Sequence, residues 1–189
     1  MDVVVNDTNI FIDLLSVELL EEAFKLPIDF HTVDYVVSEI VDSYQKECIM
    51  SLVDRGLLTV KEFNEIESYE IINMYGKRSN NVSVTDCSVW YYAKQNNYRL
   101  LTGDGKLRYS AINDGVMVSG ILFITDMLVD YGIVDPITMT SKLNELSSVN
   151  KRLSKKLIEE YVSKYMNIEK DVLKTSIDKV LLIQNKSKR

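Results

Sequence analysis

The chain has 189 residues, of which 46% are hydrophobic, and this suits one α/β domain with a sizeable core and an appendage. No apolar run approaches the ~18 residues that a membrane span requires, and the acidic start MDVVVND lacks the basic region of a secretory signal. A formal net charge of −6 disfavours binding to a polyanion by the body as a whole, but the charge is distributed unevenly along the chain.

The first sixty residues alternate between strand-like and helix-like patterns. DVVVN at 2–6 is a short β-branched run without alternation, which is typical of a central parallel strand buried on both faces. The elements that we predict in this part are strands over 2–6, 28–33 and 57–60, and helices over 9–24, with a candidate break at Ser16, and over 34–55.

The same alternation continues to about residue 146. We predict helices over 62–75, 82–97, 105–113, 120–131 and 137–146, and strands over 98–102 and 116–118. Strands separated by helices at this spacing predict a parallel sheet of about five strands covered on both faces.

From Asn150 onward the pattern is helical only. Residues 1–150 carry 11 Lys+Arg against 23 Asp+Glu, a balance of −12, whereas residues 151–189 carry 11 against 5, a balance of +6. Such a basic tail can hold RNA, fold back on the acidic body or bind an acidic partner, and we favour packing on the body with a contribution to dimer contacts. Its apolar side chains form two stripes: Leu153, Leu157, Ile158 and Tyr161, and then Val172, Leu173, Ile177, Val180 and Leu181.

Few other residues suggest chemistry. Cys48 and Cys87 fall in helical patterns, which indicates buried thiols in a reducing cytosol, and no Cys/His cluster predicts a zinc site. His31, the only histidine, lies inside a predicted strand, so we expect a structural role for it. We expect Trp90 to pack in the core rather than stack on a nucleic-acid base.

Four acids stand out because each lies at a strand-to-helix junction or in a helix beside apolar residues: Asp7, Glu39, Asp86 and Asp104. Carboxylates around a dry pocket repel one another unless a hard cation neutralises them, and Mg²⁺ or Mn²⁺ is the natural candidate. We therefore expect raised carboxylate pKa values in the metal-free protein. A chain with one histidine offers little to covalent catalysis, so metal-dependent phosphodiester hydrolysis is our first hypothesis.

Each acid also has an ordinary structural interpretation. Asp7 is a favoured residue for capping the helix that follows it, and Asp104 beside glycine is common turn chemistry. Asp86, three residues after Ser83, matches a capping arrangement, and an isolated helical Glu39 is usually just solvated. From the residues alone both interpretations stay open.

Several motifs together resemble those of PIN-domain ribonucleases, the family that includes the VapC-type toxins of bacterial toxin–antitoxin pairs. They are DTNIFIDLL at 7–15, YVVSEIV at 35–41, SVTDCSVWYYAK at 83–94, GDGKL at 103–107 and GILFITDMLVDYGI at 120–133. The resemblance covers roughly residues 1 to 135. It implies a three-layer α/β/α fold whose parallel sheet has the order 3-2-1-4-5, with a PIN-like nuclease domain over 1–149 and a helical, basic extension over 150–189.

The resemblance also implies roles for particular residues. Asp7, Glu39, Asp86 and Asp104 would be the catalytic residues and the ligands of Mg²⁺ or Mn²⁺, with Thr8, Asn9 and Thr102 holding them in place. The order 3-2-1-4-5 would bring Asp7 and Asp104 side by side. Many toxin relatives carry a further acid soon after the position of Asp104, where this chain has Lys106 and Arg108, which we interpret as phosphate-binding residues.

The implied activity is that of a cytoplasmic endoribonuclease acting on single-stranded or structured RNA. Water attacks in the family mechanism, so the products carry 5′-phosphate and 3′-hydroxyl ends. An antitoxin protein and a second copy of the chain are the candidate partners. The alternative is a catalytically silent PIN-fold module that binds RNA or protein. A haloacid-dehalogenase-like phosphatase is disfavoured, because that class needs an aspartate at the position of Asn9.

Overall fold

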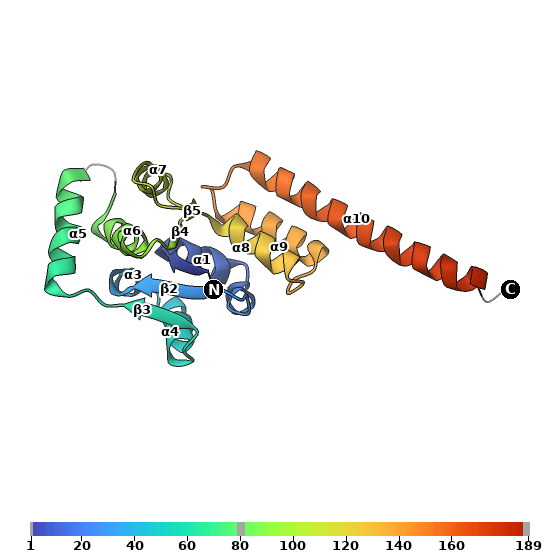
Figure 1. Cartoon of the computed structure of the whole chain (residues 1–189), viewed down its shortest axis with the longest axis horizontal. Coiled ribbons are helices and arrows are strands. Elements are labelled where there is room, and N and C mark those ends of the chain that lie inside the picture. The colour runs from blue at the N-terminus through green and yellow to red at the C-terminus, as the bar shows by residue number, and fades with distance from the viewer. Residues whose placement is uncertain (1, 79–81, 187–189) are drawn as a thin grey trace.

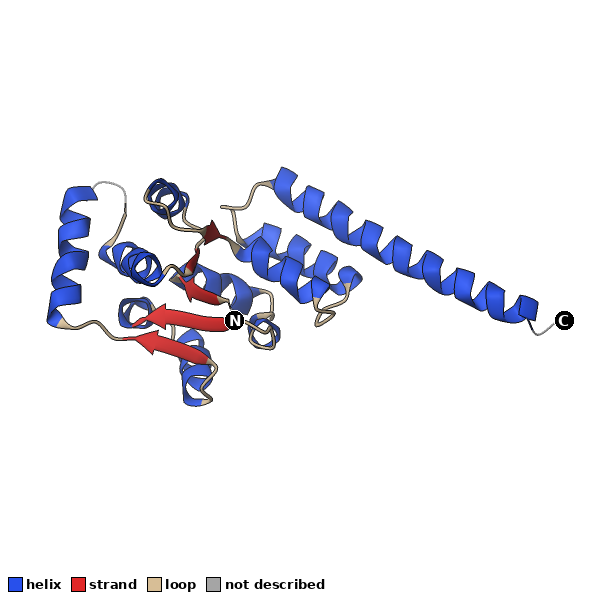
Figure 2. Cartoon of the chain, viewed as in Figure 1, coloured by secondary structure: helices blue, strands red, loops and turns tan. Residues whose placement is uncertain are grey.

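The computed structural model describes residues 2–78 and 82–186 and shows one twisted, fully parallel sheet (Figures 1 and 2). Its strand order is β3-β2-β1-β4-β5, so the predicted five-stranded parallel sheet of order 3-2-1-4-5 is confirmed. The strands are β1 Val3–Asn6, β2 Asp29–Val33, β3 Leu58–Lys61, β4 Arg99–Leu101 and β5 Val118–Ser119.

The helices of the described residues follow the predicted order, except that the single helix predicted over 34–55 is wrong. They are α1 Thr8–Ser16, α2 Leu20–Ala23, α3 Asp34–Glu39, α4 Ser43–Asp54, α5 Glu65–Arg78, α6 Val84–Asn96, α7 Gly105–Asn113, α8 Ile121–Asp130, α9 Pro136–Val149 and α10 Lys155–Lys186. The stretch over 34–55 is two helices, because the chain turns at residues 40–42 and the Asp42 side chain caps α4 by accepting from the Gln45 backbone N–H at 2.8 Å.

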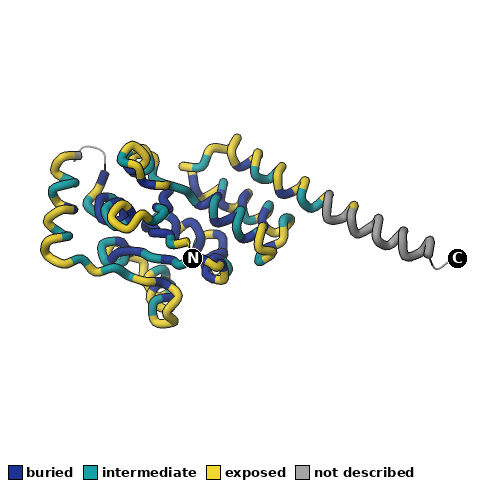
Figure 3. Tube along the Cα trace, in the orientation of Figure 1, coloured by how far each residue is buried: buried dark blue, intermediate teal, exposed yellow. Residues whose placement is uncertain are grey.

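Helices cover both faces of the sheet, as a parallel sheet requires. Helix α6 contacts β1, β2 and β4 on one face, and α4 contacts β3 on the other, where α1 packs against α8 and α9 (Figure 1). Val4 and Val5 of β1 are fully buried, and so is Trp90 of α6, as predicted. Figure 3 shows this buried centre in dark blue. The sheet is therefore a rigid base from which the strand ends project.

His31 has the structural setting that the sequence predicts. It lies in β2, its Nδ1 is 2.8 Å from the Tyr92 hydroxyl, and its ring packs on the rings of Tyr92 and Tyr98. Burial lowers the pKa of its imidazole, which keeps the ring neutral.

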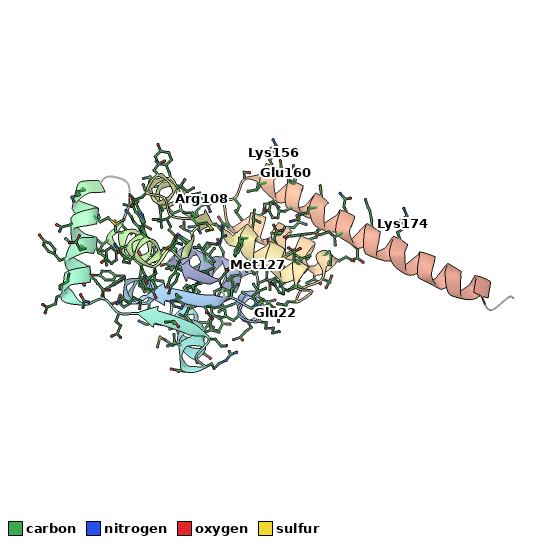
Figure 4. The ribbon with its side chains drawn as sticks, in the orientation of Figure 1. Glu22, Arg108, Met127, Lys156, Glu160 and Lys174 are labelled. Atoms are coloured by element: carbon green, nitrogen blue, oxygen red, sulfur yellow. The ribbon has the colours of Figure 1, made fainter. Side chains whose placement is uncertain are left out.

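The first half of α10 packs on the body and the helix then runs outward (Figure 1). Ile158 and Tyr165 are buried, and the Tyr165 hydroxyl donates to Asp126 Oδ1 at 2.9 Å. Lys164 Nζ lies 2.6 Å from the same oxygen. In Figure 4, Lys156, Glu160 and Lys174 lie on the side of α10 that faces away from α8 and α9.

Of the two predicted apolar stripes of the tail, the structure describes the side chains of the first. Leu153, Ile158 and Tyr161 of the first stripe pack against the core, with Leu157 at 36% exposure. The second stripe, from Val172 to Leu181, lies outside the residues whose side chains the structure describes. Among residues 2–78 and 82–186, no helix is long and apolar enough to cross a bilayer.

Candidate functional site

The candidate site lies where β1 and β4 end side by side. Val5 pairs with Leu100 and Asn6 with Leu101, and the Asp7 backbone N–H donates to the Leu101 carbonyl at 3.0 Å. The carboxyl ends of parallel strands, where the strand order reverses, are where α/β sheets place their ligands. The strand pairing thus brings Asp7 next to the turn of residues 102–104, as the strand order predicts.

Asp7 is a buried carboxylate held by two side chains. Only 2% of its surface is exposed, and its Oδ2 accepts from Thr102 Oγ1 at 2.8 Å and from Asn9 Nδ2 at 3.1 Å. Burial raises its pKa to about 6, the charge of Asp86 adds to the rise, and the two donors oppose it. Asp7 occupies the N-cap position of α1 but makes no side-chain capping hydrogen bond, so capping does not account for its burial.

Asp86 both caps α6 and lies near the other acids, so the two interpretations that the sequence left open both apply to it. It forms a capping box with Ser83: the Ser83 N–H donates to Asp86 Oδ2 at 2.7 Å, and the Asp86 N–H donates to Ser83 Oγ at 2.9 Å. Burial raises the pKa of its carboxyl, and the charges of Asp104 and Glu39 raise it further. At both Asp7 and Asp86, burial is the largest cause of the raised pKa, and repulsion between the acids adds a smaller rise.

Asp104 is half-buried, as Asp86 is, and Glu39 is exposed. Asp104 caps α7, because its Oδ1 accepts from the backbone N–H groups of Lys106 and Leu107, both at 2.8 Å. Glu39 ends α3, and its Oε2 accepts from Thr8 Oγ1 at 2.8 Å. Thr8, Asn9 and Thr102, which the resemblance implied as positioning groups, all hydrogen-bond to one of the acids.

The four acids form one electrostatic group centred on Asp86. Its charge acts on Asp7, and the charges of Asp104 and Glu39 act on it. None of the four takes part in an ion pair within the described part of the chain. In residues 2–78 and 82–186, no three carboxylates are close enough to hold one metal ion together. The donors are of the type that Mg²⁺ and Mn²⁺ prefer, but binding would need side-chain rearrangement.

Lys106 and Arg108 differ in exposure and in their contacts with the rest of the protein. Lys106 is exposed at the start of α7. Arg108 is half-buried between α7 and β5 (Figure 4), donates to the Thr102 carbonyl at 2.8 Å, and has a pKa lowered by burial. A groove of about 930 Å³ begins at Thr102–Gly105, passes Arg108 and ends at α10.

A second buried acid near the site was missed by the sequence analysis. Asp13 of α1 is 3% exposed and accepts from Asn150 Nδ2 at 2.7 Å, and its Oδ1 lies 3.4 Å from Arg152. The Arg152 guanidinium also donates to Asn9 Oδ1. The signal for Asp13 was present, because it falls on the apolar stripe between Ile10 and Leu14, where a charge needs a partner.

The strand order and the group of acids at the switch point define the architecture of the site, and a match to a family model gives the family. A family described as a PIN domain (DUF3368) matches residues 3–167, so the chain belongs to the PIN-domain family. The match extends past the residues that carry the resemblance and includes Asn150, Arg152 and the packed first part of α10.

Several solved structures are similar to this chain at low identity. FitAcB from Neisseria gonorrhoeae is 15% identical, over 61% of this chain and 95% of that one, with a TM-score of 0.40. VapBC-1 from nontypeable Haemophilus influenzae is 18% identical, over 64% and 98%, with a TM-score of 0.45. VapBC2 from Rickettsia felis, bound to a DNA fragment from its promoter, is 17% identical, over 62% and 98%, at 0.42. No curated protein matches the sequence.

Proposed function

We propose that the protein is a Mg²⁺- or Mn²⁺-dependent endoribonuclease that hydrolyses phosphodiester bonds of single-stranded or structured RNA. Its membership of the PIN-domain family supports this class of activity. The observation that carries the proposal is Asp7: a buried carboxylate with a raised pKa, facing further acids and no ion-pair partner among the described residues. A group arranged in this way is more stable with an added cation.

In this proposal the acids and their neighbours divide the work. Asp7, Glu39, Asp86 and Asp104 would hold the metal ion, which lowers the pKa of a bound water and supports attack on phosphorus. Thr102 and Asn9 keep Asp7 in place, and Thr8 does the same for Glu39. Lys106 is exposed next to Asp104, and with Arg108 it would bind the substrate phosphate.

We further propose a role in a toxin–antitoxin pair, from the likeness of the motifs to those of VapC-type toxins. An antitoxin protein and a second copy of the chain are then the partners, and the reducing cytosol suits the two cysteines. The basic segment 150–189, which we treat as an extension of a domain over 1–149, would contribute packing and contacts.

Cleavage of a labelled single-stranded RNA, with Mn²⁺ and with EDTA, tests the activity. We expect wild-type protein to cut only with the metal and to leave 5′-phosphate ends. Asp7→Asn should lose at least about 1,000-fold in rate, which corresponds to about 4 kcal/mol of transition-state stabilisation. Glu62→Gln removes an exposed acid outside the group and is the matched control.

The second candidate is a catalytically silent module that binds RNA or protein. It is favoured by the finding that no three carboxylates of the described residues are grouped for one metal ion. Binding of the RNA by wild type and by Asp7→Asn with equal affinity, and no cleavage by either protein at any Mn²⁺ concentration, would establish the module and reject the nuclease.

A further inference from the structure

We infer that Arg152 is a positioning residue for the acid site: it fixes the amide of Asn9 and, through it, the carboxylate of Asp7. This inference rests on the proposed metal-dependent function. Arg152 lies in the segment between α9 and α10, 143 positions from Asn9 in the sequence, and its guanidinium donates to Asn9 Oδ1. Asn9 Nδ2 in turn donates to Asp7 Oδ2 at 3.1 Å.

The direction of each hydrogen bond follows from the chemistry of its donor. A guanidinium has five N–H groups and no acceptor, so only the carbonyl oxygen of the Asn9 amide can face it. The NH₂ group of the amide must then face the other way, toward Asp7. Without Arg152 nothing among these contacts holds the Asn9 carbonyl oxygen, so the amide can rotate and its NH₂ group can leave Asp7. Arg152 thus selects the one amide orientation that supports Asp7.

Thr102 supports Asp7 in the same directed way. Its Oγ1 accepts from the Asp104 backbone N–H at 3.0 Å, so its own hydrogen is available for Asp7 Oδ2 at 2.8 Å. Both side-chain donors therefore arrive at Oδ2, and neither reaches Oδ1. Two fixed donors on one oxygen limit the rotation of the Asp7 carboxylate.

Arg152 is itself held by buried partners. Asp13 Oδ1 lies 3.4 Å from its Nη2, and Asn150 Oδ1 accepts from the Arg152 backbone N–H at 2.8 Å. Asn150 also donates to Asp13 Oδ2 at 2.7 Å and is only 6% exposed. A side chain at Gly103 would place its Cβ 3.8 Å from Arg152 Nε, so the guanidinium also lies against the 102–104 turn.

The alternative interpretation is that this hydrogen-bond network only anchors the turn before α10 to the body and has no effect on Asp7; we call this structural role the latch. Asp13 and Asn150 make that anchor by themselves, because they join α1 to the end of α9 with both side chains buried. The contact of Arg152 with Asn9 is made at a half-buried amide whose other end touches the candidate metal ligand. Residues that orient metal ligands in this way typically change metal affinity or activity by 10–100-fold when removed.

The test compares Arg152→Ala, Asn9→Ala and their double variant with Lys151→Ala, which removes an exposed positive charge from the same segment. Mn²⁺ affinity by titration calorimetry and the kcat and KM of RNA cleavage are measured on the full chain. We expect Arg152→Ala and Asn9→Ala each to weaken Mn²⁺ binding by about tenfold and to lower kcat, with KM within about twofold. The double variant should lose no more than the worse single variant, because both act on one carboxylate. Arg152→Lys keeps the charge without the fork and should recover only part of the loss.

Three results would overturn the inference while the proposed function stands. One is a raised KM with unchanged kcat and Mn²⁺ affinity, which indicates a direct phosphate contact. Another is a lower melting temperature with unchanged Mn²⁺ affinity, which indicates the latch. The third is an Arg152→Ala protein whose Mn²⁺ affinity, kcat and KM equal those of Lys151→Ala. A wild-type protein that neither binds Mn²⁺ nor cleaves RNA would reject the proposed function, and the inference with it.

Discussion

Two regions of this protein each contain one buried carboxylate with further acids nearby, and the two regions neutralise these carboxylates differently. In the seam between the body and the 150–165 segment, two acids each meet a cation: the buried Asp13 meets Arg152, and the half-buried Asp126 meets Lys164 at 2.6 Å. At the acid edge, formed by Asp7, Glu39, Asp86 and Asp104, the described residues supply hydroxyl, amide and backbone donors but no ion pair.

The difference indicates what each region is for. A buried charge is costly unless it is paired, so the seam pairs its acids and thereby joins α10 to the domain. The acid edge leaves the pKa of Asp7 at about 6 and that of Asp86 raised, an arrangement that weakens the metal-free fold. Proteins accept such a cost at functional sites, where a ligand removes it.

The largest expected effect comes from removing the seam. A chain ending after Asn150 lacks Ile158 and Tyr165, both buried, and each such side chain contributes about 2 kcal/mol. We expect this chain to be insoluble or to melt far below wild type, whereas a chain ending after Lys170 keeps these contacts and melts near wild type. Equal melting temperatures for all three chains would remove the structural role that we assign to the seam.

Asp13→Ala should cost about 3 kcal/mol, because it leaves the buried Asn150 amide without its acceptor and removes the carboxylate partner of Arg152. Denaturant unfolding at pH 7.5 measures this free energy. Asp13→Asn keeps one acceptor oxygen and should lose less. If Asp13→Ala were as stable as wild type, the contrast between the two regions would not hold.

Asp7→Asn should increase the free energy of unfolding in EDTA, whereas Asp13→Ala should decrease it. The folded-state pKa of Asp7, about 6, is above its ordinary 3.8, so its proton is held more tightly in the folded protein. Ionisation therefore removes stability as the pH rises from about 4 through 6, by up to about 3 kcal/mol at 1.36 kcal/mol per pKa unit. We expect Asp7→Asn to be more stable than wild type by about 2 kcal/mol at pH 7.5.

At pH 3.5 most of this advantage should be gone, since Asp7 is then largely protonated in both states. Melting curves of the two proteins across this pH range give the comparison. An advantage that does not change with pH would show that the Asp7 charge is not its cause.

The smallest effect separates the two roles of Asp104. Asp104→Asn keeps an oxygen for capping α7 and should change stability by only a few tenths of a kcal/mol, whereas Asp104→Ala should cost about 1 kcal/mol. In our proposal both variants lose RNA cleavage. An Asp104→Asn protein with full activity would leave Asp104 as a cap alone.

The sequence by itself determined the elements and their order, because strand and helix periodicity depend on neighbouring residues. The β-branched run at 2–6 predicted the central strand, and the resemblance carried by Asp7, Asp86 and Asp104 implied the strand order. The sequence also holds a signal for the break before α4, because Asp42 and Gln45 form a capping pair that starts a new helix.

Only the tertiary structure decided which side chains meet. Asp13 and Asn150 are 137 positions apart, and no periodicity relates them. The same holds for Arg152 and Asn9, whose contact depends on how α9 returns the chain to α1. Sequence patterns report which face of an element is buried, but the partner of a buried charge is set by packing between distant segments.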